Sequence, residues 1–360
     1  MAVPQSSAHE SAGIGGVSLT LVGAYPGLRA LAWHDDVLYA SQGYKLLRAK
    51  IGTSLIEWES VAEYHPSWWR NLTSAWRLSS RFFRDGFHAL AVLASGHIVA
   101  AVPGAILTLK PGENEFLLSH KVIRGTRPLH ITATPKGHIY WGEYFDNPQR
   151  DEVHIYVSTD HGEKWNIAYT FHKGTIRHVH NIVYDEWQDC LWVFTGDNGP
   201  ECRILRASSD FRNVEVVLSG NQQARAVAAV PTQQGLYFSS DTPFEVNHVY
   251  RLDPHSELTA LASLGSSSIY GCRVEEAIFF STMVEPSAVN SDQNVRLYSS
   301  LDGTSWDPAL AWKKDHWSMK LFQYGNAFLP DGRNTSGFLA VSTIAVKGAD
   351  LETSLWQVNS

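Results

Sequence analysis

Short apolar runs separated by polar turns repeat along this chain of 360 residues. Each unit starts with an apolar or alternating run, passes a turn, and continues into a second run of strand length that is rich in Val, Ile, Leu, Tyr, Phe and Ala. In the first unit, residues 29–33 precede a turn at Asp35 and Asp36, and residues 37–41 follow it. The units recur at intervals of roughly 40 to 55 residues. Seven units are present, and their first runs are 29–33, 88–92, 130–134, 178–184, 225–229, 270–274 and 324–328.

A repeat of this length predicts the blades of an all-β, seven-bladed β-propeller. The last unit runs through residues 354–358 and is one strand short of four, whereas the run 17–22 precedes the first complete unit. Pairing the N-terminal strand into the last blade closes the ring and removes exposed sheet edges. We therefore predict a single propeller domain over residues 17–360 and a flexible N-terminus at 1–16. A two-sheet sandwich is the alternative fold, but it does not predict seven copies of one pattern.

Residues 66–85 interrupt the repeat. Trp69, Leu72, Trp76 and Phe83 recur there at near-helical spacing, with arginines between them. This pattern predicts one short helical insertion between the first and second blades. Two roles stay open for it: a helix that fills a gap between blades, or a lid over the ring.

Composition and charge narrow the classes of function. A net charge of -7 argues against a general nucleic-acid binder, which needs a basic face. Three cysteines, at 190, 202 and 272, form neither a disulfide framework nor a zinc-binding spacing. Because the N-terminus has no signal-peptide core and no apolar run can span a membrane, we expect a cytoplasmic protein with no membrane partner. A secreted protein whose leader has been removed has the same pattern, and the oligomeric state is left open.

A turn motif lies at residues 158–165. Ser158, Asp160, Gly162 and Trp165 follow the pattern Ser-x-Asp-x-Gly-x-x-Trp. The Asp160 carboxylate can accept hydrogen bonds from the backbone of its own turn, and glycine tolerates the positive φ that the turn needs. A shortened copy occurs at 300–306 and a partial copy at 208–210.

This motif resembles the Asp-box (BNR) repeat of the sialidase-like β-propeller superfamily. The resemblance implies that the motif supports the turn between the third and fourth strands of a blade and takes no part in catalysis. It also implies a family that includes sialidases, other glycoside hydrolases, some polysaccharide lyases and several non-enzymes.

Cationic and aromatic residues gather where the first strands of the blades begin, near the central axis on one face. Converging titratable groups in such a concave mouth predict the site. The residues predicted to bind a substrate there are Arg29, His88, Arg127, Arg177, Arg225, Tyr270 and Tyr324.

Two histidines in the fourth unit are the strongest candidates for chemistry. His178 and His180 point to the same side of a strand, a spacing that suits metal ligands or an acid/base pair. With His130 and Tyr144 they form the predicted catalytic group. No cofactor is required by this prediction of the site. Whether His178 and His180 bind a divalent metal is left open.

Arginine, histidine and tyrosine in one mouth suit an anionic ligand such as a uronate-containing glycan. Cleavage by β-elimination needs a group that neutralises the carboxylate, a base and an acid, which these residue types can provide. The set is similar in residue types to propeller-fold polysaccharide lyases that act on ulvan and oligogalacturonate. A polysaccharide or oligosaccharide lyase is the leading hypothesis. The alternatives are an Asp-box glycoside hydrolase that uses Glu143 or Asp197 as its acid, and a non-catalytic glycan- or protein-binding propeller.

Overall fold

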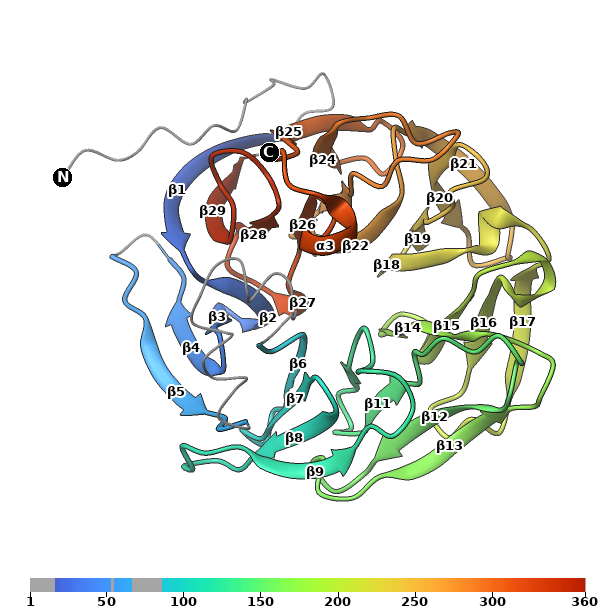
Figure 1. The fold of residues 1–360 in the computed structure, drawn as a ribbon, viewed down its shortest axis with the longest axis horizontal. Coiled ribbons are helices and arrows are strands. Elements are labelled where there is room, and N and C mark those ends of the chain that lie inside the picture. The colour runs from blue at the N-terminus through green and yellow to red at the C-terminus, as the bar shows by residue number, and fades with distance from the viewer. Residues whose placement is uncertain (1–16, 53–54, 67–85, 360) are drawn as a thin grey trace.

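The protein is a seven-bladed β-propeller in the computed structural model, which describes residues 17–52, 55–66 and 86–359. Seven separate sheets stand around one axis (Figure 1). The predicted flexible N-terminus and all but the first residue of the predicted helical insertion lie outside the described residues. The described helical segments are short: α3 (Met319–Phe322), η1 (Gly199–Glu201) and η2 (Gln222–Ala224).

The strands of each blade run outward from the axis in nearly sequential order. Blades one to three contain β27 (Asp331–Asn334), β2 (Arg29–Asp35), β3 (Val37–Gln42), β4 (Lys45–Lys50) and β5 (Glu59–Glu63); β6 (Ala89–Val92), β7 (Ile98–Val102), β8 (Ala105–Leu109) and β9 (Leu117–Lys121); and β10 (Thr132–Ala133), β11 (Ile139–Gly142), β12 (Val153–Ser158) and β13 (Asn166–Phe171). Blades four to six contain β14 (His178–Asp185), β15 (Cys190–Gly196), β16 (Arg203–Ala207) and β17 (Val214–Ser219); β18 (Ala226–Thr232), β19 (Gly235–Ser240), β20 (Asn247–Leu252) and β21 (Leu258–Leu264); and β22 (Ser268–Val274), β23 (Ala277–Thr282), β24 (Asn294–Ser300) and β25 (Asp307–Lys313). Blade seven contains β26 (Asn326–Phe328), β28 (Phe338–Ile344), β29 (Glu352–Asn359) and β1 (Ser18–Pro26).

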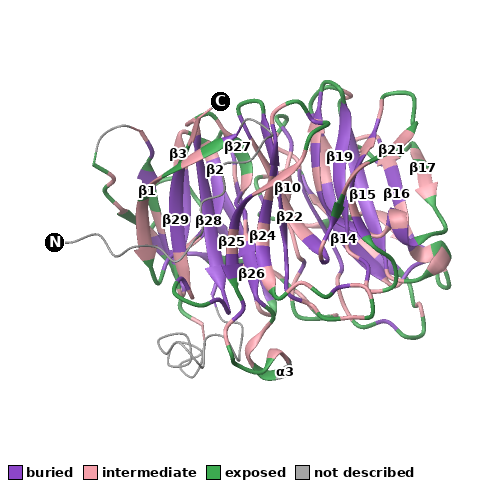
Figure 2. Ribbon diagram, turned by 90° about the horizontal axis from the view of Figure 1, so that it is seen from above, coloured by how far each residue is buried: buried purple, intermediate pink, exposed green. Residues whose placement is uncertain are grey.

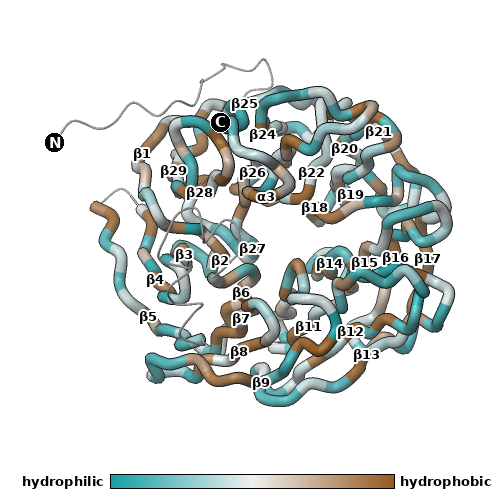
Figure 3. Tube along the Cα trace, viewed as in Figure 1, coloured by the Kyte–Doolittle hydropathy of each residue, from teal (hydrophilic) through white to brown (hydrophobic). Residues whose placement is uncertain are grey.

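The core lies between the blades, with one apolar cluster at each of the seven interfaces. Successive strand residues face opposite neighbours, as the period of two requires. On β19, Leu236 and Phe238 pack toward blade four, whereas Tyr237 packs toward blade six. The second strands are therefore apolar on both faces, and Figure 2 shows buried residues along the strands that are visible from the side of the ring. Hydrophobic segments likewise recur in blade after blade around the ring (Figure 3).

The ring closes as predicted. β1 is the outermost strand of blade seven and pairs antiparallel with β29, from Ser18 opposite Asn359 to Pro26 opposite Glu352. The two ends of the domain are thus hydrogen-bonded to each other in one sheet (Figure 1). This pairing covers the outer edge of β29, which would otherwise expose unpaired backbone groups.

Blade one departs from the predicted pattern because it has five strands. β27 inserts on the axial side of β2 and runs parallel to it, with Asp331 opposite Ala32. The prediction that residues 29–33 form the innermost strand of this blade is therefore wrong. The sequence of β27, Asp-Gly-Arg-Asn, has no apolar alternation that would indicate a strand. In blade six, β22 starts at Ser268, so that Tyr270 is the third residue of its strand and not the first.

The predicted turn motif has the expected geometry between β12 and β13. Ser158 Oγ donates to Asp160 Oδ1 at 2.8 Å, and the carboxylate accepts the Lys164 backbone N–H at 2.9 Å. Gly162 has a φ of 88°, and a Cβ there would lie 2.5 Å from Val99 Cγ2. The motif therefore joins blade three to blade two as well as shaping its own turn.

Candidate functional site

The strand starts bring the predicted site residues to one end of the ring in two groups. The first group lines a cavity of about 180 Å³, which we call the arginine pocket. Predicted residues that line the arginine pocket are Arg29, His88, Arg127, Tyr270 and Tyr324. They come from blades one, two, six and seven and from the segment leading into blade three.

Arg29 is one of two arginines that line the arginine pocket. Its guanidinium lies over the Phe328 ring, 4.2 Å from the centroid, and its Nη2 donates to the His88 carbonyl at 3.4 Å. Burial lowers the pKa of Arg29, and the nearby Tyr270 and Asp331 oppose that shift. Its Nε–H is buried and has no hydrogen-bond partner among the described residues. An anion entering the pocket would supply an acceptor for it.

His130 lies beside the arginine pocket, away from the other predicted catalytic residues, His178, His180 and Tyr144. Its Nδ1 lies 3.1 Å from Asp331 Oδ2, and its ring centroid is 6.1 Å from that of Tyr270. Sequence analysis missed Asp331 because this residue lies in β27, where no local pattern indicates a strand.

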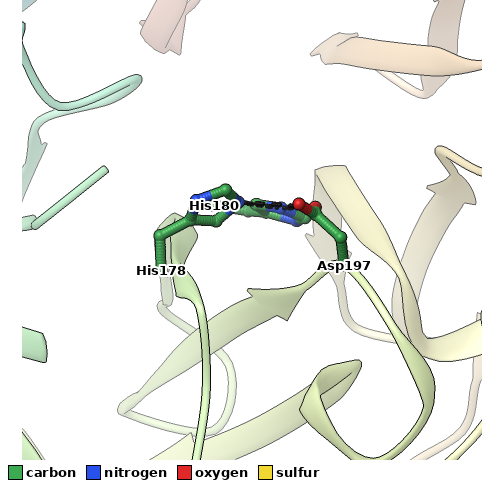
Figure 4. Close-up of side chains that lie close together, drawn as sticks. All are labelled: His178, His180 and Asp197. Atoms are coloured by element: carbon green, nitrogen blue, oxygen red, sulfur yellow. Dashed lines mark hydrogen bonds and ion pairs between the residues drawn. The ribbon is translucent and has the colours of Figure 1, made fainter. Parts of the chain in front are cut away.

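The second group contains His178, His180 and Asp197, which we call the His–Asp cluster. Both histidines lie on β14, and Asp197 directly follows β15, the neighbouring strand (Figure 4). Asp197 Oδ1 lies 3.4 Å from His178 Nε2 and 3.1 Å from His180 Nε2, and the two Nε2 atoms are 3.1 Å apart. The β14–β15 register shifts between Val179 and Asn181, so a bulge at His180 helps to aim its ring at this point. Within the described part of the chain, these three residues are the ones able to hold a metal ion together.

Two arginines pair with Asp197, Arg177 at the oxygen that faces away from the histidines and Arg225 at the oxygen that the histidines also approach. Arg177 Nη1 donates to Asp197 Oδ2 at 3.2 Å and pairs through Nη2 with Asp146. Arg225 Nη2 lies 3.7 Å from Asp197 Oδ1 and 3.8 Å from Asp241 Oδ2. The Nε–H groups of both arginines are buried and find no acceptor among the described residues.

Burial and nearby charges shift the pKa values of the ionisable side chains in and beside the His–Asp cluster. Burial alone would raise the pKa of Asp197, but the contacts with His178 and His180 hold it well below its usual range. Burial lowers the pKa of His178, although Asp197 favours the charged ring. Burial raises the pKa of Tyr144 to about 12, and Asp197 and Asp241 add to that rise. At neutral pH Asp197 is therefore a carboxylate and Tyr144 a neutral phenol.

Tyr144 lies against the His–Asp cluster, with its ring centroid 4.3 Å from that of His178. Glu143, the neighbouring candidate acid, is 6% exposed and fully engaged elsewhere. It accepts from Arg124 Nε at 2.9 Å and from the His154 backbone N–H at 2.8 Å. Glu143 therefore supports the loop between β11 and β12.

Gln222 is a second residue that sequence analysis did not propose. Its side-chain amide donates to the Asp197 carbonyl at 3.1 Å and accepts from Thr242 Oγ1 at 2.7 Å. It lies in η2, a short turn before β18 that carries no apolar periodicity. The residue ties the loop of blade four that carries Asp197 to blade five.

The comparisons with known proteins establish the fold alone. No family model and no curated protein matches the sequence. A chain from the crystal structure of the mitotic checkpoint complex is similar over 95% of both chains, with 9% identity and a TM-score of 0.58. The WD40 β-propeller domain of Doa1 is similar over 95% of this chain and 96% of that one, with 11% identity and a TM-score of 0.55. The sialidase-like superfamily that the Asp-box motif suggests is not confirmed by these matches.

One further finding concerns membranes. No helix in the described ranges is both long enough and apolar enough to cross a bilayer.

Proposed function

We propose that this protein is a non-catalytic binding propeller that takes an anionic, uronate-bearing glycan at its axial mouth. The observation that carries the proposal is the buried Nε–H of Arg29, which lines the arginine pocket and has no acceptor within the described residues. A buried donor without a partner costs about 1–3 kcal/mol, so a ligand that satisfies it gains that energy. A carboxylate suits this role because its two oxygens match the guanidinium geometry.

The arginine pocket sets the scale of the ligand. Its volume of about 180 Å³ is below the ~300–1,000 Å³ of sites for drug-sized molecules. It therefore suits one charged sugar residue better than a stretch of polymer. Phe328, Tyr270 and Tyr324 provide apolar surface beside the cations, as sugar recognition needs.

Binding is favoured over turnover because the candidate bases are engaged. The Nε2 atoms of His178 and His180 face each other and Asp197, which leaves neither directed at a substrate. Tyr144 is protonated near neutral pH and can donate a proton but not remove one. The glycoside hydrolase hypothesis loses both of its proposed acids, since Glu143 is bound to Arg124 and Asp197 stays ionised.

A β-elimination lyase is the second candidate function. It is favoured by Tyr144, a neutral phenol beside Arg177 and Arg225 that could protonate a leaving oxygen. Elimination would leave an unsaturated product that absorbs ultraviolet light, whereas binding leaves the absorbance unchanged.

Calorimetric titration with galacturonate and glucuronate oligosaccharides, against their neutral galactose and glucose counterparts, tests the proposal. We expect binding of the acidic sugars and a weakening of about 10- to 100-fold in Arg29→Gln, because a hydrogen bond to a charged group contributes about 1.5–3 kcal/mol. Arg48→Gln is the matched control, since Arg48 pairs with Glu59 on the outer strands of blade one and is half exposed. Equal affinity for acidic and neutral sugars, or an equal loss in both variants, would overturn the proposal. Rising ultraviolet absorbance would establish the lyase in its place.

A further inference from the structure

We propose that His178, His180 and Asp197 bind one divalent transition-metal ion at the axial edge of blade four. The inference does not depend on the proposed glycan ligand. It rests on which atoms of the two imidazoles carry hydrogen, on the spacing of the three facing atoms, and on the shell that holds them.

Backbone carbonyls determine the tautomer of both histidines. His178 Nδ1 lies 3.1 Å from the Phe145 carbonyl oxygen, and His180 Nδ1 lies 3.0 Å from the Ala226 carbonyl oxygen. A carbonyl can only accept, so each Nδ1 must carry the hydrogen. In neutral imidazoles the Nε2 atoms then present lone pairs. An Nδ1–H bond to a backbone carbonyl is the usual arrangement around a metal-bound histidine.

Three electron-rich atoms consequently meet at one point. The two Nε2 lone pairs and Asp197 Oδ1 are 3.1, 3.1 and 3.4 Å from one another. Ligands bonded at 2.0–2.2 Å in a tetrahedral or octahedral complex stand about 2.8 to 3.6 Å apart. The observed triangle has the dimensions of one face of such a complex. Two histidines and one carboxylate are also a ligand set that proteins use for zinc and for other divalent transition metals.

A single proton satisfies the cluster less well than a metal ion. A proton on one Nε2 makes one good hydrogen bond to Asp197 Oδ1 and leaves the other Nε2 lone pair facing an acceptor. Both histidines are buried, with His180 only 3% exposed, so water compensates poorly. A cation in the centre is attracted by all three atoms at once.

The surroundings hold Asp197 in the orientation that a ligand needs. Arg177 Nη1 binds the carboxylate oxygen that faces away from the histidines, Oδ2, at 3.2 Å. Asp146 and Asp241 pair with Arg177 and Arg225, which offsets the positive charge of the arginines near the cluster. Arg177 is thus a positioning residue for the site.

Zinc binding to the full-length protein tests the proposal directly. After treatment with a chelator and dialysis, the protein is titrated with ZnCl₂ against a colorimetric zinc chelator, without any sugar present. We expect one equivalent to bind, and we expect His180→Gln and Asp197→Asn each to lose at least about 100-fold in affinity. Arg177→Gln should lose about 10- to 100-fold, the range seen when a partner of a ligand is removed. Cobalt(II) in place of zinc adds a visible spectrum, strong for a four-coordinate ion and weak for a six-coordinate one.

A surface histidine pair provides the control. The His97 and His161 rings stack at 4.5 Å on the exterior and could bind zinc adventitiously. The double variant with His97→Gln and His161→Gln should keep the one-equivalent titration. The proposal is overturned if this double variant abolishes binding, or if His180→Gln and Asp197→Asn remain folded by circular dichroism and bind zinc like the wild type. Failure to bind acidic sugars would leave the metal result untouched, so the two proposals are tested separately.

Discussion

Replacing Gly196 by alanine is expected to displace the His180 imidazole. A Cβ on Gly196 would lie 2.3 Å from His180 Cε1 and 2.9 Å from His180 Nε2. Carbon atoms in contact are normally about 3.5–4.0 Å apart, so the ring has to move by about 1 Å. A ring displaced that far loses its 3.0 Å bond to the Ala226 carbonyl or its 3.1 Å approach to Asp197. Overpacking of this kind costs about 1–3 kcal/mol in the free energy of unfolding.

Equilibrium denaturation in urea measures that loss, and the zinc titration measures the damage to the His–Asp cluster. We expect Gly196→Ala to lower the denaturation midpoint and to weaken zinc binding by at least about 10-fold. Gly52→Ala is the matched control, because a Cβ at Gly52 meets no atom within 4 Å. Its stability should stay within about 0.5 kcal/mol of the wild type. If Gly196→Ala matches the wild type in both stability and zinc affinity, the close approach of His180 to β15 is not what organises the cluster.

Two further predictions concern the fold. Trp141 is 2% exposed at the interface of blades two and three and stacks on Tyr156 at 4.3 Å, so Trp141→Ala should cost about 3–5 kcal/mol in urea denaturation. Trp187→Ala, at a 40% exposed position, should cost less than about 1 kcal/mol, and equal losses would contradict this account of the core. Hydrogen bonds from the backbone N–H groups of Ser305 and Thr304 hold the pKa of Asp302 below its usual range. The ionised Asp302 side chain therefore stabilises the fold above pH ~3.9, and this stabilisation is lost as the pH falls through the pKa of Asp302 in the folded protein. Asp302→Asn keeps a hydrogen-bond acceptor but has no charge to lose. As the pH is lowered below about 4, the variant should therefore lose less of its unfolding free energy than the wild type does. If the two proteins lose stability in parallel over this pH range, ionised Asp302 does not stabilise the fold.

Much of the fold could be predicted because its signals are local. Period-two alternation and turn residues mark each strand pair, and the recurrence of that pattern at blade length indicates a propeller. The closure of β1 on β29 followed from a count of strands, since the last unit lacked one and the N-terminus had one to spare. Gly162 and Asp160 likewise determine their turn from within it.

The sequence suggested which residue types gather at the candidate site, but not how the structure groups them. The approach of His178 to His180 depends on their spacing in one strand, so the sequence could indicate it. Asp197 lies across the β14–β15 hairpin, and its role as the common partner of both histidines depended on a bulge that no pattern marked. His130 was grouped with His178, yet it lies beside Asp331.

The sequence by itself thus determined the all-β class, the seven-blade repeat, the closing strand and the residue types at the mouth, because each depends on periodicity or on neighbours a few positions apart. The tertiary structure alone decided the parallel insertion of β27 beside β2, the separation of the arginine pocket from the His–Asp cluster, and the tautomers of His178 and His180. These features depend on pairings between distant segments, such as Asp331 with Ala32 and His180 with the Ala226 carbonyl. Such pairings are selected by how whole blades pack around the axis, and the residues that make them carry no local mark of their partner.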